Sequence, residues 1–171
     1  MKKALNAWTV NGALDMEQTF HAVAEAGFDA IELNVDAPGA AHGLSLDTTK
    51  ADFAAIRGLS EKYHLPVASI SSSLWGARMG IAANHRDAEA LLWKQVEAAK
   101  ELGANGILTV PGGMGGGVTI ADVRRDSVAF LKAMRADIEK EGIFVGLENV
   151  WNGFFLSPYD MVSVIDEVGS A

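Results

Sequence analysis

The chain has 171 residues, 49% of them hydrophobic and 21% charged, which is enough for one domain with a full-sized core. Its net charge of −8 argues against binding along a nucleic-acid backbone, which requires basic patches. The absence of cysteine excludes disulfides and thiolate metal sites. No segment reads as a signal peptide or a membrane span, so we expect a cytoplasmic protein without a membrane partner.

Five units, each a strand followed by a helix, are predicted in chain order. The predicted strands are short apolar runs, at residues 4–10, 28–33, 65–71, 105–110 and 143–147. Asp15 is expected to cap the first helix, and the second helix is expected to begin at Asp47 or Thr48. The third helix starts near Arg86, and the fourth ends at Gly142.

The start of the fifth helix has the clearest signal in the chain. Ser157 supplies a hydroxyl cap, Pro158 takes the first helical position, and Asp160 follows three residues after the cap. With strands roughly 25 to 40 residues apart, parallel pairing through right-handed crossovers is expected.

The spacing of the units favours a partial barrel over an open nucleotide-binding sheet. The first strand is not followed by a dinucleotide-binding glycine fingerprint, and the glycine-rich segment 112–117 lacks the Gly-Lys-Ser/Thr ending of a P-loop. A complete (β/α)₈ barrel takes about 250 residues for eight units. Five units in 171 residues have a similar number of residues per unit. We therefore predict one α/β domain over 1–171, the N-terminal five-eighths of a TIM barrel. Its first and fifth strands would be open edges, so a homo-oligomer is expected.

Glu148 is the main candidate for chemistry, because it ends the fifth apolar run just before a polar and aromatic loop. In that loop, Trp151 and Asn152 are candidates for lining a substrate pocket, although Trp151 could equally serve packing. Trp8 and Glu32 are expected to end the first and second strands. Trp8 is either pocket wall or barrel plug, and Glu32 either binds substrate or makes a structural ion pair.

Three segments carry a family resemblance that covers essentially the whole chain. They are Leu-Glu-Asn-Val-Trp-Asn-Gly-Phe-Phe-Leu-Ser-Pro at 147–158 with Ile-Asp-Glu-Val-Gly-Ser at 165–170, Ala-Gly-Phe-Asp-Ala-Ile-Glu at 26–32, and Leu-Gly-Ala-Asn-Gly-Ile at 102–107. Together they resemble the xylose isomerase-like TIM-barrel superfamily, in particular its sugar phosphate isomerase/epimerase branch. That branch includes ketose 3-epimerases.

The resemblance implies a metal-dependent proton transfer next to the carbonyl of a small sugar or sugar phosphate. It implies a divalent ion (Mn, Mg, Zn or Co) held by a Glu, an Asp, a His and a second Glu on strands five to eight. Glu148 matches the first of these and is therefore both the expected metal ligand and the expected catalytic base. The other three would follow the fifth unit, so we expect activity in a longer parent and none in this chain alone.

Alternative functions are suggested by residues that depart from the family's pattern and by the open strand edges of a partial barrel. Some ketose epimerases contact the sugar through a Glu six residues after the metal-binding one, where this chain has Phe154. The related endonuclease branch needs histidines at the tips of strands two and three, whereas Asp36 and Ser73 stand there. The segment 112–117 could expose N–H groups to a phosphate but is better read as a flexible loop. A non-catalytic scaffold that self-associates through its sheet edges is the main alternative.

Overall fold

The computed structural model describes residues 1–113 and 117–170. It confirms an α/β fold with parallel strands in the order β1-β2-β3-β4-β5, as expected for the first part of a TIM barrel. The chain forms two compact units, one of Met1–Leu74 and Trp93–Ile107, the other of Trp75–Leu92 and the residues from Leu108 onward. Of the helices in the described ranges, none is long and apolar enough to cross a membrane.

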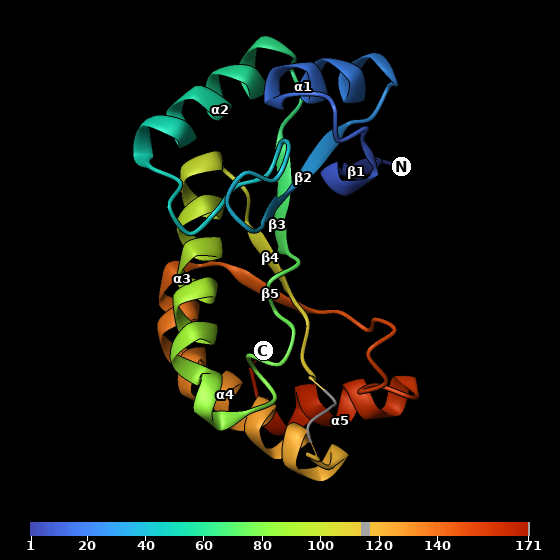
Figure 1. Ribbon diagram of the computed structural model, residues 1–171, viewed down its shortest axis with the longest axis vertical. Coiled ribbons are helices and arrows are strands. Elements are labelled where there is room, and N and C mark those ends of the chain that lie inside the picture. The colour runs from blue at the N-terminus through green and yellow to red at the C-terminus, as the bar shows by residue number, and fades with distance from the viewer. Residues whose placement is uncertain (114–116, 171) are drawn as a thin grey trace. The chain divides into compact units, whose positions relative to one another are not determined.

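The first unit contains three complete strands and two complete helices. Its elements are β1 (Ala4–Asn6), α1 (Met16–Glu25), β2 (Ala30–Val35), α2 (Lys50–Lys62) and β3 (Val67–Ser72). Strand β1 pairs with β2, and β2 pairs with β3, both in parallel. Helices α1 and α2 lie next to each other (Figure 1).

Two elements run from one unit into the other. Helix α3 (His85–Leu102) begins in the second unit and ends in the first, and β4 (Gly106–Thr109) begins in the first unit and ends in the second. The second unit adds α4 (Ile120–Glu141), β5 (Phe144–Leu147) and α5 (Pro158–Val168). Helices α4 and α5 pack against each other (Figure 1).

Capping residues fix the helix starts within one residue. Asp15 and Gln18 form a reciprocal capping box on α1, and Ser157 with Asp160 does the same on α5. The cap Asp15, and the pair Ser157 and Asp160, were predicted from the sequence. Helix α2 begins at Lys50 rather than near Asp47, because the cap is Thr49.

The first two strands differ from their predicted bounds. Strand β1 stops at Asn6, whose side-chain Oδ1 accepts the Trp8 backbone N–H at 2.9 Å, and residues Ala7–Thr9 form a 3₁₀ turn. Trp8 therefore lies just beyond the strand. Strand β2 runs two residues further than predicted, so Glu32 lies within the strand and does not end it.

Candidate functional site

A row of polar side chains crosses β1, β2 and β3 in the first unit. Asn6 is the register partner of Glu32, and Glu32 is the partner of Ser69. The Asn6 Nδ2 group donates to Glu32 Oε1 at 2.6 Å, and the Ser69 hydroxyl donates to Glu32 Oε2. Asn34, two residues on, exchanges hydrogen bonds with Asn6 at 3.1 and 3.2 Å. Both carboxylate oxygens of Glu32 therefore have a donor.

The polar row occupies one face of the sheet because side chains alternate along a strand. Ile31, Leu33 and Val35, the intervening residues of β2, are fully buried. Glu32 and Asn34 consequently point to the opposite face, which is the inner face in a barrel of this type. Among the described residues, the hydrogen-bond partners of the Glu32 carboxylate are the uncharged side chains of Asn6 and Ser69.

Asp36 connects the three polypeptide segments that leave β1, β2 and β3. Its Oδ2 accepts the Trp8 indole N–H at 2.8 Å, and its Oδ1 accepts both the hydroxyl of Ser73 and its backbone N–H, the latter at 3.3 Å. Asp36 is only 8% exposed, whereas Trp8 is 48% exposed. The sequence placed Asp36 at the end of the second strand without giving it a role.

Glu148 directly follows β5 in the second unit, as the sequence predicted. Its backbone N–H donates to the carbonyl of Thr109 at 2.9 Å, and the Thr109 hydroxyl donates to the Gly146 carbonyl at 3.1 Å. Thr109 is fully buried, whereas Glu148 is half-buried. The β4–β5 pairing thus holds the Glu148 backbone at the carboxyl end of the sheet, where α/β barrels carry their catalytic groups.

The two candidate binding residues in the loop after Glu148 differ in exposure and contacts. Trp151 is 99% exposed. The Asn152 side chain donates to the Pro111 carbonyl at 2.9 Å and accepts the Phe154 N–H at 3.1 Å. Asn152 therefore braces the loop after β5 against the loop after β4. Phe154, which stands where some ketose epimerases have a Glu, is buried and packs on Phe155.

Glycines allow the loops of the second unit to approach closely. A Cβ on Gly80 would lie 2.1 Å from the carbonyl oxygen of Gly112, and one on Gly112 would lie 2.5 Å from Nδ2 of Asn152. A Cβ on Gly113 would lie 2.4 Å from Cα of Ala77. The loops after β3 and β4 thus pack backbone to backbone, and the loop after β4 packs against side chains of the loop after β5.

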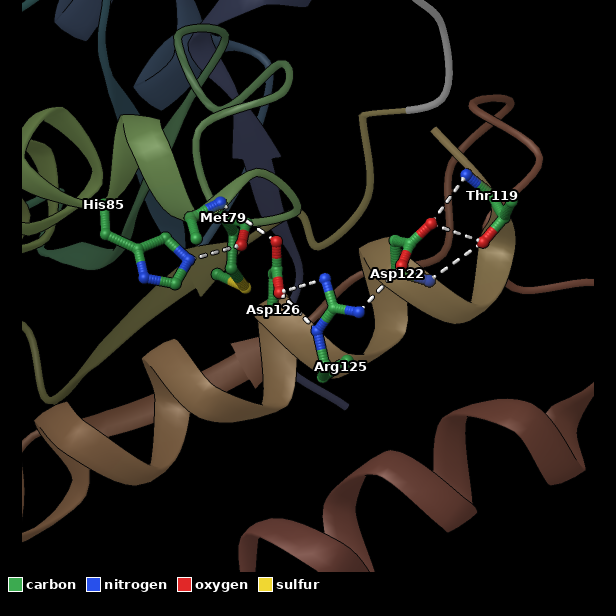
Figure 2. A network of polar contacts seen from close by, with 7 residues as sticks. Met79, His85, Thr119, Asp122, Arg125 and Asp126 are labelled. Atoms are coloured by element: carbon green, nitrogen blue, oxygen red, sulfur yellow. Dashed lines mark hydrogen bonds and ion pairs between the residues drawn. The ribbon is translucent and has the colours of Figure 1, made fainter. Parts of the chain in front are cut away.

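Polar contacts from the start of α4 hold the loop after β3 (Figure 2). Asp126 accepts the backbone N–H of Ala82 at 3.0 Å, and Arg125 bonds both Asp126 and Asp122. Hydrogen bonds from Thr119, and then from Arg125, hold the pKa of Asp122 below its ordinary value. These charges are committed to the loop and the helix cap, so they act as structural supports.

The predicted site residues fall into two groups. Trp8 and Glu32 lie in the first unit, where Asn6 contacts both of them, and Glu148, Trp151 and Asn152 lie in the second. The predicted phosphate loop at 112–117 includes residues 114–116, which lie outside the described residues. Over 1–113 and 117–170, no group of three or more His, Asp or Glu side chains could hold a metal ion.

A family model described as "Xylose isomerase-like TIM barrel" matches residues 20–171. The chain belongs to this family. The resemblance noted from the Glu148 segment is thereby confirmed at the level of the family. A search of curated proteins found no match.

Solved structures of the same fold include enzymes with different activities. D-allulose 3-epimerase from Methylomonas sp., in complex with D-allulose, is 20% identical with a TM-score of 0.74 over 99% of this chain and 59% of that one. A family 2 AP endonuclease from Brucella melitensis is 16% identical with a TM-score of 0.77 over 99% and 66%. A xylose isomerase-like TIM-barrel protein from Mycobacterium smegmatis, in complex with magnesium, is 18% identical with a TM-score of 0.71 over 98% and 61%.

At these identities the likeness establishes the fold alone. The chain spans about three fifths of the length of these structures, between 59% and 66%. Sugar epimerases are among the similar structures, and so is an endonuclease, so the fold by itself leaves the reaction open.

Proposed function

We propose that this chain supplies the β1–β5 part of the active site of a sugar or sugar-phosphate isomerase or epimerase, with Glu148 as its catalytic base. The observation that carries the proposal is the position of Glu148, half-buried directly after β5 with its backbone held by Thr109. The family match and the sugar epimerases among the similar structures support the substrate class.

A carboxylate at this position can remove a proton from a carbon next to a carbonyl. General base catalysis needs the carboxylate within hydrogen-bond reach of that proton, and an acid to return the proton. A single base can move a proton between neighbouring carbons on one face of the substrate. Inverting one carbon needs a second group on the opposite face, so epimerisation requires a partner for Glu148.

A divalent ion does not find a complete site in the described residues. Hard divalent ions take several oxygen or nitrogen ligands, and no group of three candidate ligands occurs over 1–113 and 117–170. Glu148 remains the proposed metal ligand as a single donor, and we derive no catalytic step through the ion. We accordingly propose that the chain alone is inactive and that a longer product carries the activity.

The other candidate residues are proposed to bind substrate. Trp8 and Trp151 offer exposed aromatic surface, and Glu32 offers hydrogen-bond acceptors on the inner face of β2. Asn152 is proposed to act mainly through the loop, because both ends of its side chain already make loop hydrogen bonds. A small sugar is the expected ligand.

Solvent deuterium exchange tests this proposal. The 171-residue chain and a product extended by the downstream reading frame are incubated with D-fructose or D-allulose in D₂O, and exchange next to the carbonyl is followed by NMR. We expect exchange only with the longer product, and its loss in Glu148→Gln but not in the control Glu89→Gln, an exposed acid of α3. Exchange that survives in Glu148→Gln would refute the role of Glu148.

Metal analysis of the purified chain provides an independent check. With one proposed ligand among the described residues, the chain should retain far less than one metal ion per molecule after dialysis. A stoichiometric metal in the short chain would contradict this ligand assignment.

Self-association is a second candidate function, supported by apolar surface in the second unit. Phe144 of β5 is 70% exposed, and Tyr159, Val162 and Ile165 of α5 are also exposed. A second copy is the proposed partner of the β5 edge, because an uncovered strand edge readily pairs with another chain. Sedimentation velocity decides the matter, and a well-folded monomer at all concentrations would exclude this function.

Phosphoester hydrolysis is the weakest candidate. The segments after β2 and β3 present Asp36 and Ser73, and neither supplies the histidine that the endonuclease branch needs at these tips. We expect no cleavage of DNA containing an abasic site.

A further inference from the structure

We propose that Asp36 is a positioning residue that locks the indole of Trp8 into an apolar platform for the C–H face of a sugar ring. Because this role needs a sugar ligand, it rests on the proposed function. It adds to that function a residue, Asp36, that neither the sequence motifs nor the family resemblance assigns to binding.

The geometry of Asp36 fits a clamp on the indole. Its Oδ2 accepts the Trp8 Nε1–H at 2.8 Å, the distance of a charge-assisted hydrogen bond. Its Oδ1 is held by the hydroxyl and backbone N–H of Ser73. One carboxylate thereby joins the segments that follow β1, β2 and β3, at the end of the strands where barrels of this fold bind substrate.

The backbone around Asp36 is itself fixed. Its N–H donates to the Leu44 carbonyl at 2.8 Å, and the Leu44 N–H donates to the Asn34 carbonyl at 2.8 Å. Gly43 lies beside the carboxylate, since a Cβ there would be in ordinary van der Waals contact with Asp36 Oδ2, at 3.5 Å. The carboxylate is therefore nearly buried in a rigid setting, and its direction is set before any ligand arrives.

The hydrogen bond also determines what Trp8 can offer to a ligand. The indole N–H is occupied by Asp36, while the Trp8 residue as a whole is 48% exposed. With its N–H bonded, the indole ring can offer a ligand only aromatic carbon, which suits the C–H face of a sugar and not its hydroxyl edge. Among the described residues, the side chains that hydrogen-bond to the carboxylates of Glu32 and Asp36 are all uncharged. Two carboxylates without a bonded cation favour a sugar ring that carries no negative charge on the face toward them.

NMR of the indole N–H tests the clamp without any ligand. The Trp8 Nε1–H resonance is identified by its loss in Trp8→Phe. In the wild-type chain it should exchange with solvent at least about tenfold more slowly than in Asp36→Ala, because a hydrogen-bonded proton must open before it exchanges. Equal exchange rates in the two proteins would overturn the clamp. Asp47→Ala, which removes an exposed acid of the same loop, is the matched control and should leave the rate unchanged.

Sugar affinity tests the platform. Dissociation constants of D-fructose and D-allulose are measured by ligand-observed NMR for the wild-type chain and each variant. Trp8→Ala should weaken binding about tenfold through lost stacking, and Trp8→Phe and Asp36→Ala about threefold each through lost positioning. The combined Trp8→Phe/Asp36→Ala variant should also lose only about threefold, because both changes remove one interaction. Asp47→Ala should bind as the wild type does.

The outcomes separate this role from the proposed function. Sugar binding by the wild type that is insensitive to Trp8→Ala would overturn the platform and leave the proposed function standing. No binding of either sugar by the wild-type chain or the longer product would overturn both. If Asp36→Ala fails to fold, the half-exposed Trp8→Phe and the more conservative Asp36→Asn carry the same test. Additive losses in the combined variant would show that Asp36 does not act through Trp8.

Discussion

A methyl group added at Gly80 should unfold the loop packing that supports the Glu148 segment. Gly80 is buried and is not among the glycines with positive φ, so its backbone can accept alanine. The added Cβ would nevertheless lie 2.1 Å from the Gly112 carbonyl oxygen and 2.6 Å from Cγ1 of Val123. The nearest atom belongs to the backbone, so relief requires the loops after β3 and β4 to separate.

The size of the effect follows from how far the loops must move. An ordinary contact between carbon and oxygen is longer than the 2.1 Å available, by more than an ångström. Overpacking of this kind costs about 3 kcal/mol. For a chain of this length, such a loss lowers the melting temperature by about 6 to 12 °C. The Gly112 contact with Asn152 would loosen together with it.

Thermal and urea unfolding followed by circular dichroism measure this effect. Gly58→Ala is the matched control, because Gly58 lies in helix α2 with nothing within 4 Å of its added Cβ. It should raise stability by about 1 kcal/mol through helix propensity. A Gly80→Ala variant as stable as the wild type would refute the close packing of the two loops.

Three further changes test other parts of the second unit. Asn152→Ala leaves its two loop partners unpaired and should cost about 1 to 2 kcal/mol in urea unfolding. Hydrogen bonds from the backbone N–H groups of Leu156 and Ser157 lower the pKa of Asp160. The stabilisation that ionised Asp160 gives to the fold is therefore complete above its ordinary pKa of 3.8 and is lost as pH falls through its lower folded pKa. Asp160→Asn should flatten this pH dependence of stability, measured by circular dichroism. Phe144→Glu should weaken any self-association at least about tenfold in sedimentation velocity, with little change in melting temperature.

Local signals in the sequence were sufficient for the starts of α1 and α5 and for the end of α4. The α1 and α5 starts follow from Asp15 and Ser157, because a capping box involves only four consecutive residues. Gly142 adopts the left-handed conformation that ends α4, with φ of 69°. A helix whose ends are specified within one turn can be predicted without knowledge of its neighbours.

Strand ends depended on contacts that the sequence does not display. Apolar residues continue past Asn6, yet the Asn6 side chain caps the following turn and ends β1. Strand β2 extends to Val35 because Asn34 and Val35 pair with Ser71 and Ser72 of β3. The strict alternation of polar and apolar residues from Ile31 to Asp36 was the available signal for this extension, and it would also have placed Asp36 on the same face as Glu32.

Glu148 was found from the sequence because one segment carries both its strand and its loop. Asp36 was missed because its role depends on residues after two other strands, Trp8 and Ser73. Likewise, Asn152 bonds the carbonyl of Pro111, which lies 41 residues earlier in the chain. No local sequence pattern encodes such a contact. A residue whose position depends on one segment is therefore easier to predict here than one whose contacts come from several segments.

The two glutamates that the sequence singled out differ in the chemistry open to them. Both oxygens of Glu32 accept hydrogen bonds, one from Asn6 and one from Ser69. Such an acid is suited to hold its neighbours and to accept a hydrogen bond. Glu148 directly follows β5, at the point where the chain leaves the sheet. We therefore keep proton transfer as the proposal for Glu148, and we propose that the hydrogen bonds around Glu32 fix the direction of its carboxylate on the inner face of the first unit.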